Sequence, residues 1–98
     1  MRKVLLDFNP AQTTEWIHEY ISFELEFPEY YGRNLDALYD QLTSLTEDIC
    51  LGVFCPPKDE SRLSKYLNRV GKVMRDAEAE NPHLCVIFGE MEENYEDE

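Results

Sequence analysis

The chain has 98 residues, 43% of them hydrophobic and 12% aromatic, which is the length and composition of one small folded domain. It carries 21 acidic and nine basic residues, a net charge of −12. Proteins contact phosphate groups through Lys and Arg, so this charge argues against nucleic acid or an anionic membrane as the partner and favours a basic protein.

The N-terminal stretch MRKVLLDFNP holds too short an apolar run for a signal peptide, and no segment reaches the length of a membrane span. We therefore expect a cytoplasmic protein. Cys50, Cys55 and Cys85 lie in apolar runs without the C-x-x-C spacing of metal or redox sites. We expect them to be buried, reduced thiols.

The first expected elements are a strand and a helix. VLLDF at 4–8 is apolar on nearly every residue, which is typical of a strand that is buried on both faces and paired in parallel. A helix is expected to follow, with Asn9 as its N-cap and Pro10 at its first position, and to end before Pro28. Its apolar side chains recur at spacings of three and four residues: Trp16, Ile17, Tyr20, Ile21 and Leu25.

The next segment, FPEYYGRNLDALYDQLT at 27–43, reads as a loop followed by a short helix. Asn34 is the expected N-cap, and Gly32 is expected to supply the unusual backbone angle of the turn before it. Leucines at i, i+3, i+7 and i+10 form a stripe that faces the core: Leu35, Leu38, Leu42 and Leu45. A second stripe faces solvent: Asp36, Tyr39, Asp40 and Thr43.

Two more apolar runs, ICLGVF at 49–54 and LCVIF at 84–88, predict buried parallel strands of the same kind. Between them, PPKDES at 56–61 ends the earlier strand and supplies the cap of a long helix, which Asn81 and Pro82 end. The apolar stripe of this helix has the clearest period in the sequence: Leu63, Tyr66, Leu67, Val70, Val73, Met74 and Ala77.

These elements predict an α/β fold, a small three-stranded parallel sheet with packed helices in the order β-α-α-β-α-β and with right-handed crossovers. The domain is expected to span residues 1–89. Residues 90–98 hold six acidic and few apolar residues, so we interpret them as a flexible, solubilising tail. Without this tail the chain still has fifteen acidic against nine basic residues.

The solvent-facing stripe of the second helix combines acids with aromatic residues. Asp36 lies in the first turn, where the helix dipole favours an anion, but Asp40 lies one turn further along, where the two like charges repel. By composition alone, the stripe is interpreted as the solvent-exposed face of an amphipathic helix. However, Tyr30, Tyr31 and Tyr39 flank the acids, and tyrosine is enriched at protein interfaces. The stripe therefore also fits a docking surface for a basic protein.

The same segment resembles the barstar family, intracellular inhibitors of secreted ribonucleases of the barnase type. The matching residues are Pro28-Glu29-Tyr30-Tyr31-Gly32, Asn34-Leu35-Asp36-Ala37-Leu38, the aromatic Tyr39, Asp40 and Leu42-Thr43. Outside this run, the similarity over residues 1–89 lies in the order and length of the elements, and VMRDAEAE at 73–80 looks like the end of the family's last helix. The resemblance implies the barstar fold, which agrees with the predicted order of elements.

In this family the second helix and the loop before it plug the active site of the ribonuclease, where a central aspartate occupies a phosphate-binding position. By position, the resemblance implies that Asp40 is the phosphate mimic and Asp36 the second acid. It implies that further contacts come from Tyr30, Gly32, Asn34, Tyr39 and Thr43, with Asp76 as a peripheral acid on the third helix. The implied partner is a basic extracellular ribonuclease or a toxin's nuclease domain, bound one to one.

Several positions depart from the family pattern. Tyr39 and Leu45 stand where the family has tryptophan, and Arg33 replaces an acid. Asp76 is one methylene shorter than the family's glutamate, and Lys72, four residues earlier, is placed to pair with it. These departures leave the target nuclease open. They also leave an alternative function, a regulatory interaction module of the same fold that binds a basic non-nuclease protein.

No residue pattern predicts catalysis or a cofactor. His18 and His83 are far apart in the sequence and lack ligand spacing, so we interpret them as structural or surface residues. Asp36 and Asp40 have neither a third ligand nor a glycine-rich loop beside them, which argues against a metal site or acid–base chemistry. We therefore expect a protein that is not an enzyme and that needs no metal or cofactor.

Overall fold

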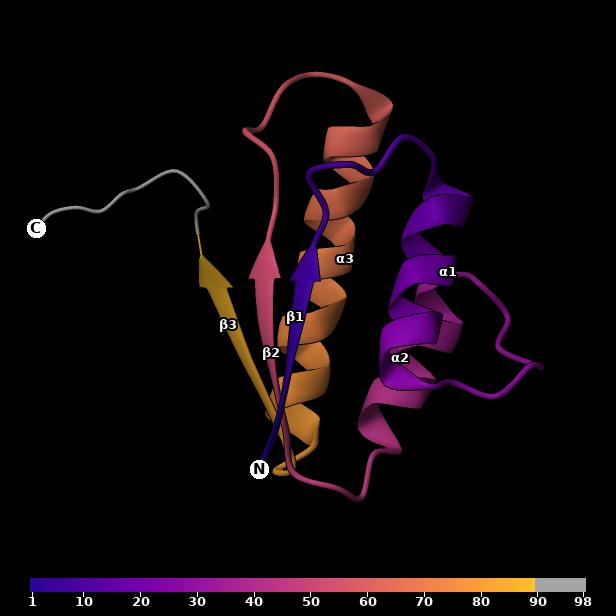
Figure 1. The fold of residues 1–98 in the computed structure, drawn as a ribbon, viewed down its shortest axis with the longest axis vertical. Helices are drawn as coiled ribbons and strands as arrows, with labels where there is room; N and C mark the ends of the chain where they lie inside the picture. The colour runs from indigo at the N-terminus through magenta and orange to yellow at the C-terminus, as the bar shows by residue number, and fades with distance from the viewer. Residues whose placement is uncertain (90–98) are drawn as a thin grey trace, which may run out of the picture.

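A computed structural model of the chain describes residues 1–89 and confirms the predicted α/β fold and order of elements (Figure 1). The elements are β1 (Arg2–Asp7), α1 (Thr14–Leu25), α2 (Leu35–Thr43), β2 (Ile49–Phe54), α3 (Arg62–Glu80) and β3 (Leu84–Gly89). None of these helices is both long enough and apolar enough to cross a membrane. The predicted acidic tail, 90–98, lies outside the described residues.

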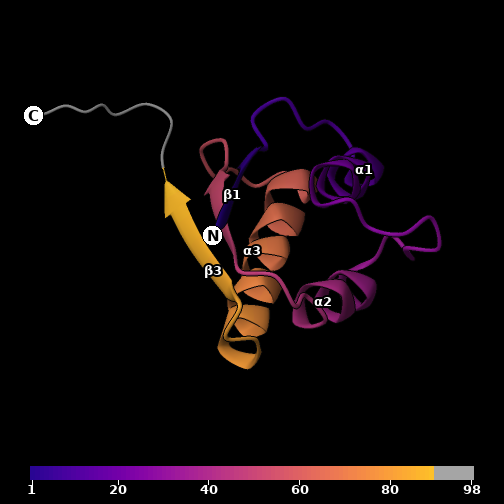
Figure 2. The same ribbon diagram turned by 60° about the horizontal axis from the view of Figure 1, so that its bottom comes forward.

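The three strands form one parallel sheet in the order β1-β2-β3. All three helices lie on one side of this sheet (Figures 1 and 2). The expectation that every strand is buried on both faces is therefore wrong. Crossovers of one hand that step across a sheet in one direction place their helices on the same face, so the other face stays open. Leu5 of β1 and Ile87 of β3 lie on the open face and are 66% and 57% exposed.

The core fills the space between the sheet and the three helices. Leu38 and Leu42 of α2 have no exposed surface, and Leu35 and Leu45 pack at the edge of the core, as their spacing predicted. Burying one leucine side chain contributes about 1.5–3 kcal/mol. This stripe therefore fixes which side of α2 faces away from the core. The other fully buried side chains include Leu6, Phe8, Ile17, Ile21, Leu51 and Met74.

The start of α1 differs from the prediction. Thr13, not Asn9, is the N-cap, because its Oγ1 accepts a hydrogen bond from the Trp16 backbone N–H at 3.0 Å. Asn9 is bonded to Asp7, whose Oδ1 accepts from the Asn9 backbone N–H at 3.0 Å and from its side-chain amide at 2.7 Å. Local side-chain bonds of this kind compete with helix formation. The chain therefore makes a turn after β1 before α1 begins.

The three cysteines are free thiols. Cys50 is buried, as predicted, but Cys55 and Cys85 are only partly buried. Cys50 and Cys85 face each other across β2 and β3 on the open side of the sheet. Burial raises the pKa of the Cys55 thiol, so this group stays protonated at neutral pH.

Candidate partner-binding surface

Helix α2 is anchored at both ends by asparagine side chains. Asn34 is the N-cap, as predicted, and its Oδ1 accepts from the Ala37 backbone N–H at 2.7 Å. At the other end, the buried Asn81 donates from Nδ2 to the carbonyl oxygens of Leu42 at 2.9 Å and Leu45 at 3.0 Å. These bonds satisfy backbone groups that a helix end leaves without partners. They also tie α2 to the end of α3, where Asn81 lies.

The outer face of α2 carries the two predicted carboxylates. Asp36 and Asp40 are exposed, one helical turn apart. Within residues 1–89, neither carboxylate has an ion-pair partner. Beside them, Tyr39 packs partly against the core, and the Thr43 hydroxyl donates to the Tyr39 carbonyl at 2.9 Å. The helix that carries the two acids is therefore held in place, and both carboxylates are exposed to a cationic partner.

The loop before α2 is fixed by a chain of three hydrogen-bonded side chains, of which two are buried. Tyr31 is 3% exposed, and its hydroxyl is hydrogen-bonded to His18 Nδ1 at 2.7 Å. His18 Nε2 is hydrogen-bonded to the Tyr66 hydroxyl at 2.6 Å, which links α1 and the loop to α3. A neutral imidazole donates from one nitrogen and accepts at the other, so both tyrosines can be satisfied. Burial, and to a smaller extent the nearby Arg33 charge, lower the pKa of His18.

The turn into α2 differs from the prediction in one detail. The left-handed backbone angle expected at Gly32 belongs to Arg33, whose φ is 54°. Gly32 is small for a different reason, since a Cβ atom there would lie 3.2 Å from the Ala37 Cβ. The Arg33 guanidinium donates from Nε to the Glu19 carboxylate on α1. The positive charge that departs from the family pattern is therefore paired with an acid of the same chain.

The structure gathers seven of the eight predicted contact residues on the loop and α2 (Figure 1). They are Tyr30, Gly32, Asn34, Asp36, Tyr39, Asp40 and Thr43. Tyr30 is 82% exposed, the largest exposure of any aromatic side chain in residues 1–89. Asp76 lies apart on α3, which packs against α2, and its carboxylate pairs with Lys72 Nζ at 3.3 Å, as their spacing predicted.

Comparisons with known proteins identify the family of the chain. The sequence model of the family described as Barstar (barnase inhibitor) matches residues 1–97. The chain belongs to the barstar family. A relative from Bacillus subtilis (strain 168), named "Putative ribonuclease inhibitor YrdF", is 37% identical over 82 residues, which cover 82% of this chain and 89% of the relative.

Membership of the barstar family confirms the resemblance seen in the loop and helix at 27–43. The protein is a ribonuclease inhibitor of this family and not an enzyme. Family membership also implies that it binds a ribonuclease of the barnase type. Over the described range, 1–89, no group of three or more His, Cys, Asp or Glu side chains is placed to hold a metal ion.

Two residues that hold the barstar-family surface in place were not identified as such from the sequence. His18 was interpreted only as a structural or surface residue, although Ile21 and Leu25 at i+3 and i+7 place it on the buried side of α1. Asn81 was interpreted only as the end of α3. Its acceptors are 36 and 39 residues away in the chain, and no local pattern predicts such a contact.

Proposed function

We propose that the protein inhibits a secreted or toxin-type ribonuclease by placing the Asp40 carboxylate in the enzyme's phosphate-binding site. The observation that supports this most directly is an exposed carboxylate without an ion pair in residues 1–89, on a helix anchored at both ends. We further propose that it acts in the cytoplasm and binds its target one to one.

Electrostatics support this mechanism. A ribonuclease active site must be basic to bind RNA, so its Arg, Lys and His side chains are donors that a carboxylate can use in short, charge-assisted hydrogen bonds. A carboxylate on a helix that is already held in position loses less conformational entropy on binding than one on a mobile segment. The net charge of −12 also attracts a basic enzyme over long distances and speeds the encounter.

The remaining predicted contacts take different roles in this proposal. Asp36 adds a second negative charge one turn before Asp40, and the exposed Tyr30 offers a rigid aromatic surface with a hydroxyl group. The Asn34 side chain accepts from the Ala37 N–H and donates to the Gly32 carbonyl, and the Thr43 hydroxyl donates to the Tyr39 carbonyl. These bonds shape the helix that carries the acids. Gly32 lets the loop approach Ala37, and in this proposal its backbone contacts the ribonuclease.

Asp76 and Arg33 are placed at the margin of the proposed interface. Asp76 is paired with Lys72, so a target must compete with an existing, exposed ion pair, which is worth little. Arg33 is paired with Glu19, so it adds less repulsion toward a basic enzyme than an unpaired cation in the same place. The pairing keeps the surface acidic around Asp36 and Asp40.

The test is inhibition of purified ribonucleases, barnase and a panel of other secreted bacterial enzymes, with RNA cleavage as the readout. Asp40→Ala is expected to weaken inhibition of the sensitive enzyme by at least about tenfold, because an ionic hydrogen bond in the active site is lost. Glu60→Ala removes the same charge from the exposed loop before α3 and is the matched control. Equal inhibition by Asp40→Ala and the parent protein would rule out the phosphate-mimic role.

A second candidate function is a regulatory interaction module that binds a basic protein other than a nuclease. Two features favour it: the Arg33 charge beside α2, and the partly buried Leu45, which leaves no exposed ring where the family has a tryptophan. The same panel distinguishes the candidates. A folded protein that protects RNA from none of the ribonucleases supports the interaction module.

A further inference from the structure

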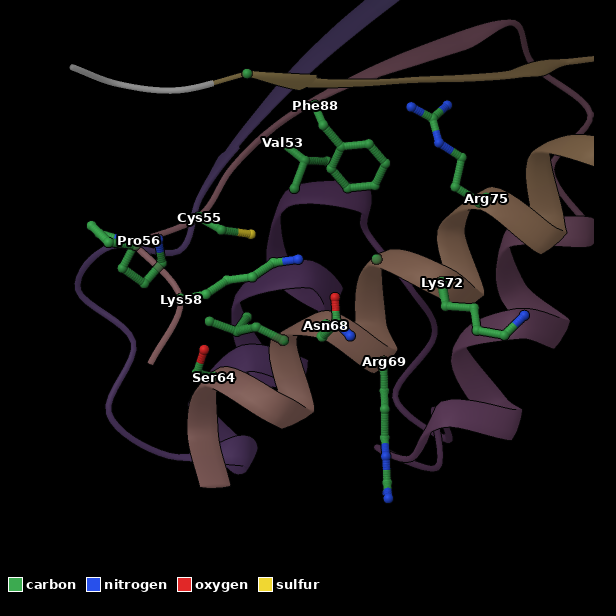
Figure 3. Close-up of a pocket in the computed structure, with 14 residues that line it drawn as sticks. Val53, Cys55, Pro56, Lys58, Ser64, Asn68, Arg69, Lys72, Arg75 and Phe88 are labelled. Atoms are coloured by element: carbon green, nitrogen blue, oxygen red, sulfur yellow. The ribbon is translucent and has the colours of Figure 1, made fainter. Parts of the chain in front are cut away.

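A separate concave site lies between α3 and the ends of β2 and β3 (Figure 3). It encloses about 600 Å³, which falls in the range of pockets that hold small organic molecules. Its described lining residues come from β2, the loop 55–58, α3 and β3, and none comes from α1 or α2. We call this site the α3–β3 groove. It is distinct from the α2 surface.

The floor of the α3–β3 groove is apolar. Val53, Leu67 and Phe88 line it, and the Phe88 ring is 39% exposed. Gly71 lies under this ring in the middle of α3, where a Cβ atom would be 3.3 Å from Phe88 Cε1. Glycine inside a helix costs about 1 kcal/mol relative to alanine. The sequence therefore places its least favourable non-proline helix residue where the ring needs room.

The charges that line the α3–β3 groove differ from those of the rest of the chain. The chain has 21 acidic and nine basic residues, yet none of the described lining residues is acidic. Four of the nine basic residues line it: Lys58, Arg69, Lys72 and Arg75. Lys72 and Arg75 are paired with Asp76 and Glu78. Within residues 1–89, the unpaired positive charge at the cavity therefore comes from Lys58 and Arg69, and this charge attracts anions.

Lys58 is placed to act on a bound molecule, whereas Arg75 is already engaged by its own chain. The Lys58 side chain extends into the cavity toward Asn68 (Figure 3), and Lys58 has no ion-pair partner in residues 1–89. The Arg75 guanidinium is fixed by two hydrogen bonds, in which Nη1 donates to the Glu78 carboxylate at 2.9 Å and to the Val86 carbonyl at 3.0 Å. Its guanidinium lies 4.6 Å from the centre of the Phe88 ring. Arg69 and Lys72 point away from the cavity, so they contribute charge rather than contacts.

We propose that the α3–β3 groove binds a small organic anion, a carboxylate or phosphate attached to a flat apolar body. The anionic group binds the Lys58 ammonium and the Asn68 amide, and the flat body packs on Val53 and Phe88. Lys58 is exposed in the free protein, and a flat apolar body that covers it would lower the local dielectric and strengthen its attraction to the anion.

The test is titration of the full-length protein with defined probes, followed by NMR of its backbone amides. The probes are 2-naphthoate, its neutral analogue 2-naphthalenemethanol, adenosine 5′-monophosphate, adenosine and inorganic phosphate. The anions with a flat body are expected to shift the amides of Asn68, Gly71 and Phe88 and to bind about tenfold more tightly than their neutral analogues. Comparison of naphthoate with the nucleotide tells whether a carboxylate or a phosphate is preferred.

Variants locate the binding. Lys58→Gln is expected to weaken binding of the preferred anion by about fivefold or more, whereas Lys65→Gln, which removes a charge from α3 outside the groove, changes it less than about twofold. Gly71→Ala adds a methyl group under Phe88 and is expected to weaken binding without unfolding the helix.

Three results would overturn the proposal. One is equal loss of affinity in Lys58→Gln and Lys65→Gln, which indicates non-specific attraction. Another is equal binding of the neutral and anionic probes. The third is a shift of the groove amides that grows with protein concentration without any probe, which indicates that a second copy of the chain occupies the groove.

Discussion

Helix α3 separates two surfaces of opposite charge that are built in different ways. On one side, the exposed acids of α2 stand on a helix whose C-terminal end is held by the buried Asn81 and whose preceding loop is held by the buried His18. On the other side, the α3–β3 groove presents cations around an apolar floor, and Lys58, the cation that enters it, stands on an exposed loop.

The difference matters for how each surface would bind. An inhibitor gains affinity when its carboxylates are already in position, because little conformational entropy is lost on binding. A cation on a loop adapts to ligands of different shape but loses more entropy when it is fixed. In the two proposals, the α2 surface therefore suits one protein target, and the α3–β3 groove suits small molecules that share only a charge and a flat body.

Asn81→Ala is expected to have the largest effect on stability. It leaves the carbonyl groups of Leu42 and Leu45 without their donor at a nearly buried site, which costs about 2–3 kcal/mol of the free energy of unfolding. The measurement is urea denaturation. The matched control is Asn68→Ala on the groove side of α3, where the side chain is exposed and the change is expected to stay within about 0.5 kcal/mol. Equal losses in both variants would contradict the contrast between the two sides.

Tyr31→Phe is expected to have the next largest effect. It removes the hydroxyl that is bonded to His18 and leaves a buried imidazole nitrogen unpaired, at a cost of about 1–2 kcal/mol in the free energy of unfolding. Tyr30→Phe, one residue away, removes a hydroxyl from an 82% exposed ring and should leave stability unchanged. In the proposed function Tyr30→Phe acts on inhibition alone, so the two variants separate the support of the loop from its contact with a target.

The contrast between local and long-range contacts also explains what the sequence could predict. The start of α2 and its N-cap were predicted correctly, because leucine spacing and Asn34 act within a few residues of each other. The predicted start of α1 was wrong because both Asn9 and Thr13 are residue types that favour the N-cap position. Asp7 takes the bonds of Asn9, and nothing in the spacing ranks the two.

Contacts between segments far apart in the chain could not be predicted from the sequence. Which face of the sheet is covered depends on the order of strands, and Leu5 and Ile87 read as core residues until that order is known. The bond from His18 to Tyr66 spans 48 residues, so neither residue alone indicates that the binding loop is fixed from α3. The exposed acids were easier to predict, because solvent exposure follows from the opposite face of one helix.

The effect of pH sharpens the comparison between the two sides, since His18 lies on the α2 side of α3. The pKa of His18 is lowered in the folded protein, mainly by burial, so the unfolded chain binds a proton more readily. Its contribution to stability is therefore complete above the unfolded pKa of 6.5 and is lost as the pH falls below that value. The urea concentration at the unfolding midpoint should therefore decrease as the pH is lowered from about 7 to 5. By NMR, the His18 ring protons of the folded protein should titrate below pH 6.5.

Gly71→Ala is expected to have the smallest effect on stability and acts on the groove side of α3. Alanine is favoured over glycine in a helix by about 1 kcal/mol, but its methyl group would approach the Phe88 ring at 3.3 Å. Phe88 is 39% exposed and borders the cavity, so the ring can move away, and a net gain of about 0.5 kcal/mol is expected by urea denaturation. Ala79→Gly, the reverse change at an exposed site of α3, should cost about 1 kcal/mol. If Gly71→Ala is more stable yet binds anions less well, the glycine is retained for the space under Phe88 and not for the stability of the helix.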